Sequence, residues 1–168
     1  MSLSMYQASI PVFQRTLGTL DKILDKAAAY AEERKIDPAV LLSARLYPDM
    51  FALTRQVQIA TDHAKGAAAR LAGVAVPSFE DSEKTFPELK VRIGKTLSFI
   101  ATLKPGQIDG SEGRDIRLKA GPRELTFKGH GYLLFFAQPN FYFPVTTAFA
   151  ILRHNGVPIG KLDFLGAA

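Results

Sequence analysis

Apolar residues recur every three or four positions in four stretches of the chain, which is the spacing of one face of an α-helix. In the second stretch this row runs from Met50 to Leu71 and consists mainly of alanine after Val57. Small side chains in such a row allow a neighbouring helix to approach closely. The spacing predicts four principal helices, near residues 5–34, 48–72, 86–103 and 140–154.

Residues that start and stop helices support these bounds. Thr85 and Glu88 match a capping box, in which each side chain binds the backbone amide of the other residue. Gly73 is a typical C-terminal cap for the second helix. Pro144 has no amide hydrogen and fits the first turn of a helix, so we expect it to mark the start of the fourth helix, with Phe143 at the boundary.

The pattern changes between residues 106 and 140. The segments "DIRLKA" and "RELTF" alternate polar and apolar residues and are separated by Gly121-Pro122, which predicts a β-hairpin. The run "YLLFFA" is compatible with either a strand or the beginning of a helix. The predicted fold class is mainly α: a four-helix bundle with a β-hairpin excursion between helices three and four.

The composition then limits the class of protein. We assign residues 1–168 to a single domain, because a chain of 168 residues buries a sizeable core. The chain has no cysteine, which excludes disulfides and thiolate metal sites, so a metal would need His, Asp or Glu ligands. The net charge of +5 comes from scattered basic residues, and we therefore expect no binding to nucleic acid.

Two further features bear on location. No apolar run approaches the ~18 residues that cross a bilayer. The N-terminal region lacks the basic segment and apolar core of a signal peptide. We therefore expect a cytoplasmic protein without a membrane partner.

Several longer motifs resemble one protein family. They are "RLYPDM" at residues 45–50, "QVQIATDHAKGAAARLAG" at 56–73, "FEDSEKTFPEL" at 79–89, "PNFYF" at 139–143 and "AILRHNGVPIGK" at 150–161. From about residue 5 to residue 166, the chain is similar to an uncharacterised family of unknown function within the DinB-like bundles. The resemblance implies a DinB-like four-helix bundle and a homodimer. Related DinB-like proteins use a three-histidine metal site, and some are thiol-dependent transferases or isomerases.

The chain departs from this resemblance at three positions. Pro144 stands where the family implies a histidine, and Phe149 stands where it implies a tyrosine. His63 is a histidine where the family implies none. The chain is therefore poorer in metal ligands than the resemblance implies.

A column of polar residues flanks the apolar row of the second predicted helix. Asp49, Gln56, His63 and Arg70 follow one another at intervals of seven residues, which places them near a neighbouring helix. Arg45 lies four residues before Asp49, a spacing at which the two can pair. Polar groups so placed form either a structural network or a polar pocket.

From this column we select the candidate residues for a small polar ligand. Tyr142 joins them as a possible hydrogen-bond donor near the start of the fourth helix, although half-buried packing is the common role of such a tyrosine. The candidate ligand-binding residues are Arg45, Asp49, Gln56, His63 and Tyr142. Outside the column, we expect Asp62 and Lys65 to face solvent, and Glu80, Asp81 and Glu83 to serve in capping and solvation.

The alternative to a ligand pocket without a cofactor is a site for a divalent metal such as zinc or nickel. Its candidate ligands are His63, His154 and Asp49. His154 also has a simpler role, because a histidine near a helix C-terminus interacts favourably with the last carbonyl groups. His130, between two glycines, is typical of a loop.

Three hypotheses for function follow. The first is a DinB-like bundle that binds a small polar ligand or a partner without a complete metal site. The second is a metal-dependent transferase or isomerase of the DinB-like kind. The third is a structural, homodimeric interaction protein.

Overall fold

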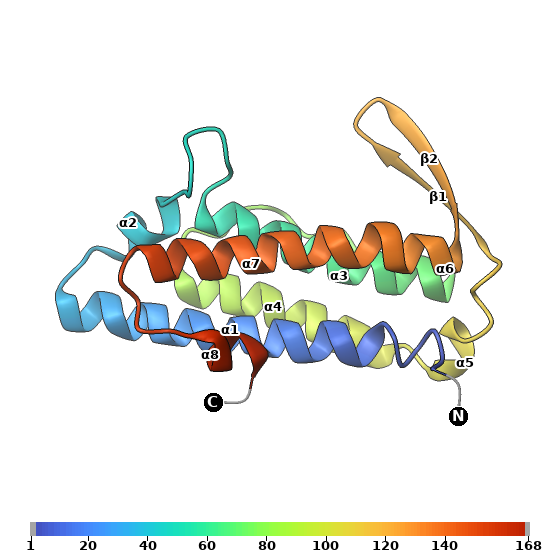
Figure 1. Cartoon of the computed structure of the whole chain (residues 1–168), viewed down its shortest axis with the longest axis horizontal. Helices are drawn as coiled ribbons and strands as arrows, with labels where there is room; N and C mark the ends of the chain where they lie inside the picture. Colours follow the sequence, from blue (N-terminus) through green and yellow to red (C-terminus); the bar gives the residue numbers. More distant parts are fainter. Residues whose placement is uncertain (1–2, 167–168) are drawn as a thin grey trace.

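The computed structural model describes residues 3–166. Its four long helices are α1 (Ile10–Arg34), α3 (Leu53–Ala72), α4 (Phe86–Thr102) and α7 (Gln138–His154). In Figure 1, α1 and α7 run from right to left, whereas α3 and α4 both run from left to right. Because α3 and α4 are parallel, the connector between them, residues 73–85, returns along the length of the bundle.

Shorter elements join or flank these helices. A hairpin of β1 (Asp115–Ala120) and β2 (Arg123–Lys128) separates α4 from α7. The strands are antiparallel, with Ile116 opposite Phe127. The remaining elements are α2 (Pro38–Ser43), α5 (Pro105–Ile108), α6 (Gly129–Tyr132), the π-helix η1 (Leu133–Ala137) and α8 (Lys161–Leu165). The predicted four-helix bundle with a β-hairpin between the third and fourth principal helices is thus confirmed.

The apolar rows read from the sequence form the core. In α3 the row occupies one buried face, and its alanines let α7 and α4 pack closely against it. Six side chains of this row are completely buried: Leu53, Val57, Ala60, Ala64, Ala67 and Leu71. Thr85 and Glu88 form the predicted capping box at the start of α4.

The predicted start of the second principal helix was wrong. We expected it near residue 48, but α3 begins at Leu53, and residues 44–52 form a loop. Pro48 lies in a turn within this loop, and the amide of Leu53 donates to the carbonyl of Ala44 at 3.0 Å, which holds the loop ends together. Asp49 is therefore a loop residue rather than a member of the helical column.

The predicted role of Pro144 was also wrong. This residue lies inside α7, beyond the first turn, because the helix begins at Gln138. The ambiguous run "YLLFFA" is helical and joins α6 to α7 through η1, so the helix was already formed before residue 140. Pro144 offers no amide to the carbonyl of Asn140, a loss that costs roughly 3 kcal/mol in an ordinary helix. Tertiary packing retains the helix, since Pro144 is buried.

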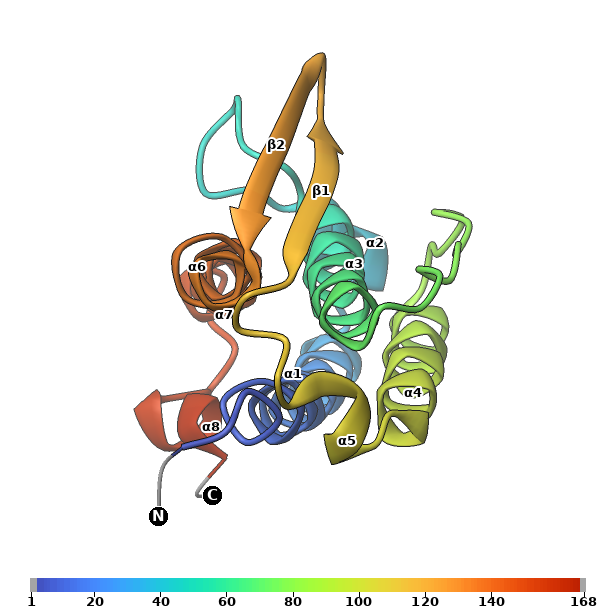
Figure 2. The ribbon, with the colours of Figure 1, turned by 90° about the vertical axis from the view of Figure 1, so that its right-hand side faces the viewer.

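The hairpin stands out from the bundle above the adjoining ends of α3 and α6 (Figure 2). Its base is anchored by buried Ile116 and by Phe127, whose ring centre lies 6.0 Å from that of Tyr132 and 5.1 Å from that of Phe136. Gly129 follows β2 directly, and a Cβ atom there would lie 1.9 Å from the backbone oxygen of Ser111. Only glycine allows this turn from strand to helix.

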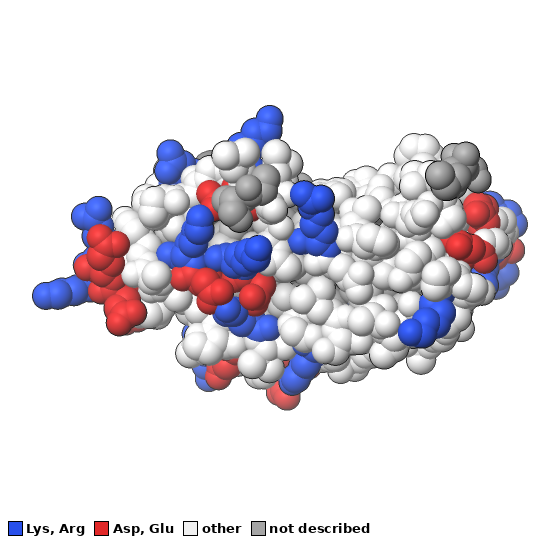
Figure 3. Space-filling view, turned by 90° about the horizontal axis from the view of Figure 1, so that it is seen from below, with Lys and Arg blue, Asp and Glu red and all other residues white. Residues whose placement is uncertain are grey.

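The opposite face of the bundle carries charges of both signs. Seen from below in Figure 3, basic and acidic side chains lie next to one another. Lys26 of α1 forms an ion pair with Asp163 of α8, and Lys90 of α4 lies 3.5 Å from Asp21 of α1. As far as the described residues go, this face lacks the patch of a single sign that nucleic-acid binding requires. Among the helices of residues 3–166, none is long and apolar enough to cross a membrane.

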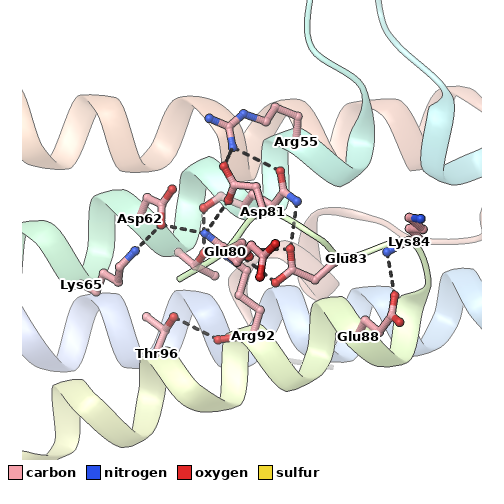
Figure 4. A network of polar contacts seen from close by, with 12 residues as sticks. Arg55, Asp62, Lys65, Glu80, Asp81, Glu83, Lys84, Glu88, Arg92 and Thr96 are labelled. Carbon is pink, nitrogen blue, oxygen red and sulfur yellow. Dashed lines mark hydrogen bonds and ion pairs between the residues drawn. The ribbon is translucent and has the colours of Figure 1, made fainter. Parts of the chain in front are cut away.

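The returning connector is held by Arg92 of α4, whose side chain is only 1% exposed. The Nε group donates to the hydroxyl of Thr61 in α3 at 2.7 Å, and Nη1 donates to the backbone oxygen of Glu80 at 3.0 Å (Figure 4). Three carboxylates complete its surroundings: Asp62 of α3 at 2.8 Å, and Asp81 and Glu83 of the connector at 3.0 and 3.1 Å. The guanidinium thereby joins α4, α3 and the connector.

A second layer of contacts surrounds this guanidinium. Lys65 is only 4% exposed, pairs with Asp62, and places its ammonium 4.5 Å from the centre of the Phe79 ring. Gln58 donates to Glu83 at 2.9 Å. The expectation that Lys65 faces solvent was therefore wrong, because the connector covers this part of α3.

The expectation for the acidic cluster of the connector needs the same correction. Asp81 and Glu83 are neither capping groups nor merely solvated, since both pair with Arg92. Asp81 also pairs with Arg55 of α3. The cluster thus holds the connector along the sides of α3 and α4 (Figure 4).

Replacing Arg92 with methionine should lower the free energy of unfolding by about 3 kcal/mol, because the carboxylates around it lose their common cation. Lys90→Met is the matched control. It removes a cation from the same helix, but its partners Asp21 and Asp25 lie near the surface, so the loss should be at most about 1 kcal/mol. Urea denaturation of both variants measures the difference, and equal losses would contradict the assignment.

Candidate functional site

A cavity of about 530 Å³ opens between α3, the first half of α7 and the loop of residues 44–52. The loop supplies one wall and the two helices supply the others. Its lining residues are Asp49, Met50, Phe51, Gln56, Ile59, His63, Pro139, Asn140, Phe143 and Pro144. The loop of residues 44–52 and the hairpin project from the same side of the bundle (Figure 1).

The polar groups of the cavity retain hydrogen-bonding capacity. Gln56 is 2% exposed, and its amide nitrogen donates to the backbone oxygen of Phe51 at 3.0 Å. Asn140 donates to the backbone oxygen of Phe136 at 2.7 Å. Within residues 3–166, no protein donor is recorded for the side-chain oxygen of either amide, and the carboxylate of Asp49 has no recorded partner. A ligand could therefore meet acceptors at three points.

Burial changes the pKa of His63, a titratable residue in the wall of the cavity. Partial burial lowers the pKa of His63 below its usual value; the nearby Asp62 carboxylate raises it, and the Arg70 guanidinium lowers it further. The net effect favours the neutral imidazole near pH 7. A neutral imidazole has one donor and one acceptor nitrogen, so His63 can bind either kind of polar group or accept a proton.

The rest of the wall is apolar. Phe51 in the loop and Phe143 on α7 are 58% and 63% exposed, and both line the cavity. Ile59, Pro139 and Pro144 complete the apolar surface. The cavity thus pairs a mainly apolar wall with a few polar groups, which is the usual composition of a small-molecule site.

The structure brings together only some of the candidate ligand-binding residues. Asp49, Gln56 and His63 line the cavity. Arg45 does not, and it donates to the backbone oxygen of Met50 at 3.1 Å, so the expected pair with Asp49 is not among the ion pairs of the described residues. Tyr142 faces two other hollows, because it projects from a different side of α7.

The alternative metal site is not assembled from its three candidate residues. His63 and Asp49 line the cavity, but His154 is exposed in the last turn of α7 and does not. Within residues 3–166, no group of three His, Cys, Asp or Glu side chains is placed to hold a metal ion. Two protein ligands are fewer than the three of a typical catalytic zinc site, so the residues present do not fit a complete centre.

Sequence reasoning selected Tyr142 from the fourth helix but missed Asn140 and Phe143 of that helix, and it missed the role of Arg92. Asn140 and Phe143 belong to the quoted motif "PNFYF", but nothing local to it shows which side faces α3. Arg92 had a detectable signal. It lies three residues after Leu89 and four before Thr96, both buried, so it occupies the inner face of its helix.

Comparison with known proteins identifies the family. Residues 5–165 match the family model described as "Domain of unknown function (DUF1993)", and the chain belongs to this family. It is also similar to the crystal structure of a DinB family member protein from Shewanella denitrificans. The two share 40% sequence identity and a TM-score of 0.87, over 97% of this chain and 92% of that chain. No protein with a curated description matches the chain significantly.

The lowered pKa of His63 makes stability depend on pH. Between its folded pKa and the unfolded value of about 6.5, the unfolded chain binds more protons, so the free energy of unfolding falls as pH falls through this window. His63→Gln should therefore lose less stability than the wild type between pH 7 and pH 5, as urea denaturation at each pH will show. His154→Gln, which removes an exposed imidazole outside the cavity, is the control. An unchanged pH dependence in His63→Gln would contradict this account.

Proposed function

We propose that this DinB-like bundle binds a small ligand, with an apolar body and at least one polar group, in the cavity between α3, α7 and the loop of residues 44–52. The observation that carries the proposal is the free acceptor capacity of Asp49, Gln56 and Asn140 within a largely apolar wall. The volume of about 530 Å³ lies within the range of small-molecule sites, roughly 300–1,000 Å³.

The proposed ligand contacts follow from the positions of these groups. The apolar body packs between Phe51 and Phe143 and rests on Ile59. The amide oxygen of Gln56 accepts a hydrogen bond from the ligand, and the neutral imidazole of His63 donates or accepts another. Because α3 and α7 are packed against each other, most of the site is formed before a ligand arrives.

The proposal includes no resident metal. His63 and Asp49 are the metal-ligating side chains in the cavity wall, and Pro144 lies in the same wall where the family resemblance implies a histidine. Proline offers no lone pair to a metal. We therefore propose a ligand cavity retained without a complete metal site.

The alternative function is a transferase or isomerase. One observation favours it: the neutral imidazole of His63 lies in the cavity, where it can remove a proton from a bound substrate. A metal-dependent form of this chemistry would need further ligands from outside the chain. The homodimer implied by the family resemblance stays a prediction. It is supported by Phe135 of η1, an apolar side chain that is 77% exposed.

Phenylacetamide, which has an aromatic ring and a neutral polar group, is a suitable probe of the cavity. Its addition should shift amide signals of cavity residues saturably in heteronuclear NMR spectra. Ile59→Trp should raise the Kd at least about tenfold, because the indole fills the cavity, whereas Ala101→Trp on the exposed side of α4 should leave it unchanged. The proposal fails if Ile59→Trp binds the probe as the wild type does.

Pro144→His tests the idea of a missing metal ligand. The new imidazole would stand in the wall that already holds His63 and Asp49, so zinc affinity should rise at least about tenfold over the wild type. Isothermal titration calorimetry on protein purified without an affinity tag measures this, with Pro144→Ala as the control for removing the proline. Tight zinc binding by the wild type that the added histidine does not change would refute it.

A further inference from the structure

Arg70 is a half-buried cation near the end of α3. Its recorded hydrogen bond joins Nη1 to the hydroxyl of Tyr132 at 3.3 Å. Among the described residues, no carboxylate pairs with it, in contrast to Arg92, which has three. This hydrogen bond uses one of the five N–H donors of the guanidinium, so the other donors of Arg70 have no partner among the described residues.

The side chain of Arg70 folds back along α3 toward His63. The evidence is Gly66, where a Cβ atom would lie 2.6 Å from Nη1 of Arg70. Residue 66 is three positions after His63, a rise of about 4.5 Å along the helix, so the guanidinium lies roughly one turn beyond the imidazole. The two groups also interact electrostatically, since Arg70 lowers the pKa of His63.

Tyr132 supplies a second donor at the same place. It is 2% exposed, and burial raises the pKa of its hydroxyl, an effect that the adjacent Arg70 opposes. The hydroxyl oxygen accepts from Arg70, and no acceptor for its own hydrogen is recorded among the described residues. A guanidinium and a phenol that both have hydrogens to donate form a suitable pair for an oxyanion.

Along the chain, the π-helix η1 lies between Tyr132 of this pair and Asn140 of the cavity wall. Tyr132 lies immediately before η1, and Asn140, in the wall of the cavity, lies two residues into α7 and donates to the backbone oxygen of Phe136 within η1. π-helical turns occur frequently at functional sites. The hairpin rises above this end of α3, and the loop of residues 44–52 rises near the other end (Figures 1 and 2).

We propose that Arg70 and Tyr132 form an oxyanion-binding subsite beyond His63, and that the ligand of the cavity carries a carboxylate or phosphate group there. The assignment of an anionic group to the cavity ligand rests on the proposed function, whereas the oxyanion subsite does not depend on it. Gly66 makes room for the guanidinium. The subsite assigns an anionic group to one end of the ligand, and the cavity holds its apolar body.

Inorganic phosphate tests the subsite without the cavity. Phosphate at Arg70 should offset the positive charge near His63, so saturating phosphate should raise the pKa of the His63 imidazole, followed by NMR. Arg70→Gln should abolish this response, whereas Arg153→Gln, which removes the same charge from an exposed position on α7, should retain it. Absence of a saturable response in the wild type, or its equal loss in both variants, would overturn the subsite.

Phenylacetate and phenylacetamide test whether the subsite and the cavity hold one ligand. The two probes differ in charge and little in shape, and the wild type should bind phenylacetate about tenfold more tightly. The Arg70→Gln variant should bind phenylacetate more weakly and phenylacetamide as before, so its preference for phenylacetate should vanish. The Tyr132→Phe variant should show a smaller preference than the wild type. If both probes bind equally well to the wild type, the proposed cavity function stands and this inference falls. A purely structural Arg70 would change stability but not the ratio of the two affinities.

Discussion

The burial of Arg92 is the constraint on which the arrangement of the bundle depends. Because the consecutive helices α3 and α4 are parallel, the connector between them must return along the bundle. This connector forms no helix whose apolar face could pack against the bundle. Arg92 solves this by offering all sides of its guanidinium to α3 and to the connector. A buried guanidinium is tolerated only where its donors are met, so the connector and Arg92 depend on each other. One side of α3 is thereby closed.

The side of α3 that faces α7 differs from the side that the connector covers. There α3, α7 and the loop of residues 44–52 enclose a cavity, and the amide oxygen of Gln56 has no partner among the described residues. The two arginines illustrate the difference: Arg92 is surrounded by acceptors, while Arg70 has one neutral partner among residues 3–166. Closed polar networks stabilise a fold, whereas open polar groups in a cavity are available to a ligand. This contrast is the physical basis for placing function on the α3–α7 side.

Membership in a DinB-like family does not by itself imply metal chemistry for this chain. The cavity wall holds one histidine and one aspartate, and a buried proline lies where a further ligand would be expected from the resemblance. Function depends on the residues of the site rather than on the fold. The same bundle can therefore retain a preformed cavity, while the side chains that line this cavity determine whether a metal, an organic ligand or a partner occupies it.

The sequence by itself determined that the four long helices and the hairpin exist, and it determined the apolar row of α3. Periodicity, capping residues and turn residues carry this information because they act over a few neighbouring positions. The sequence also placed Gln56 and His63 on one side of this apolar row. Tertiary structure alone decided where Asp49 lies, since a loop closed between Ala44 and Leu53 returns it to the cavity. It also decided that Pro144 lies within a helix, because packing against α3 outweighs the missing hydrogen bond. The partners of Arg92 and of Arg70 come from segments distant in sequence, and no local pattern specifies such contacts.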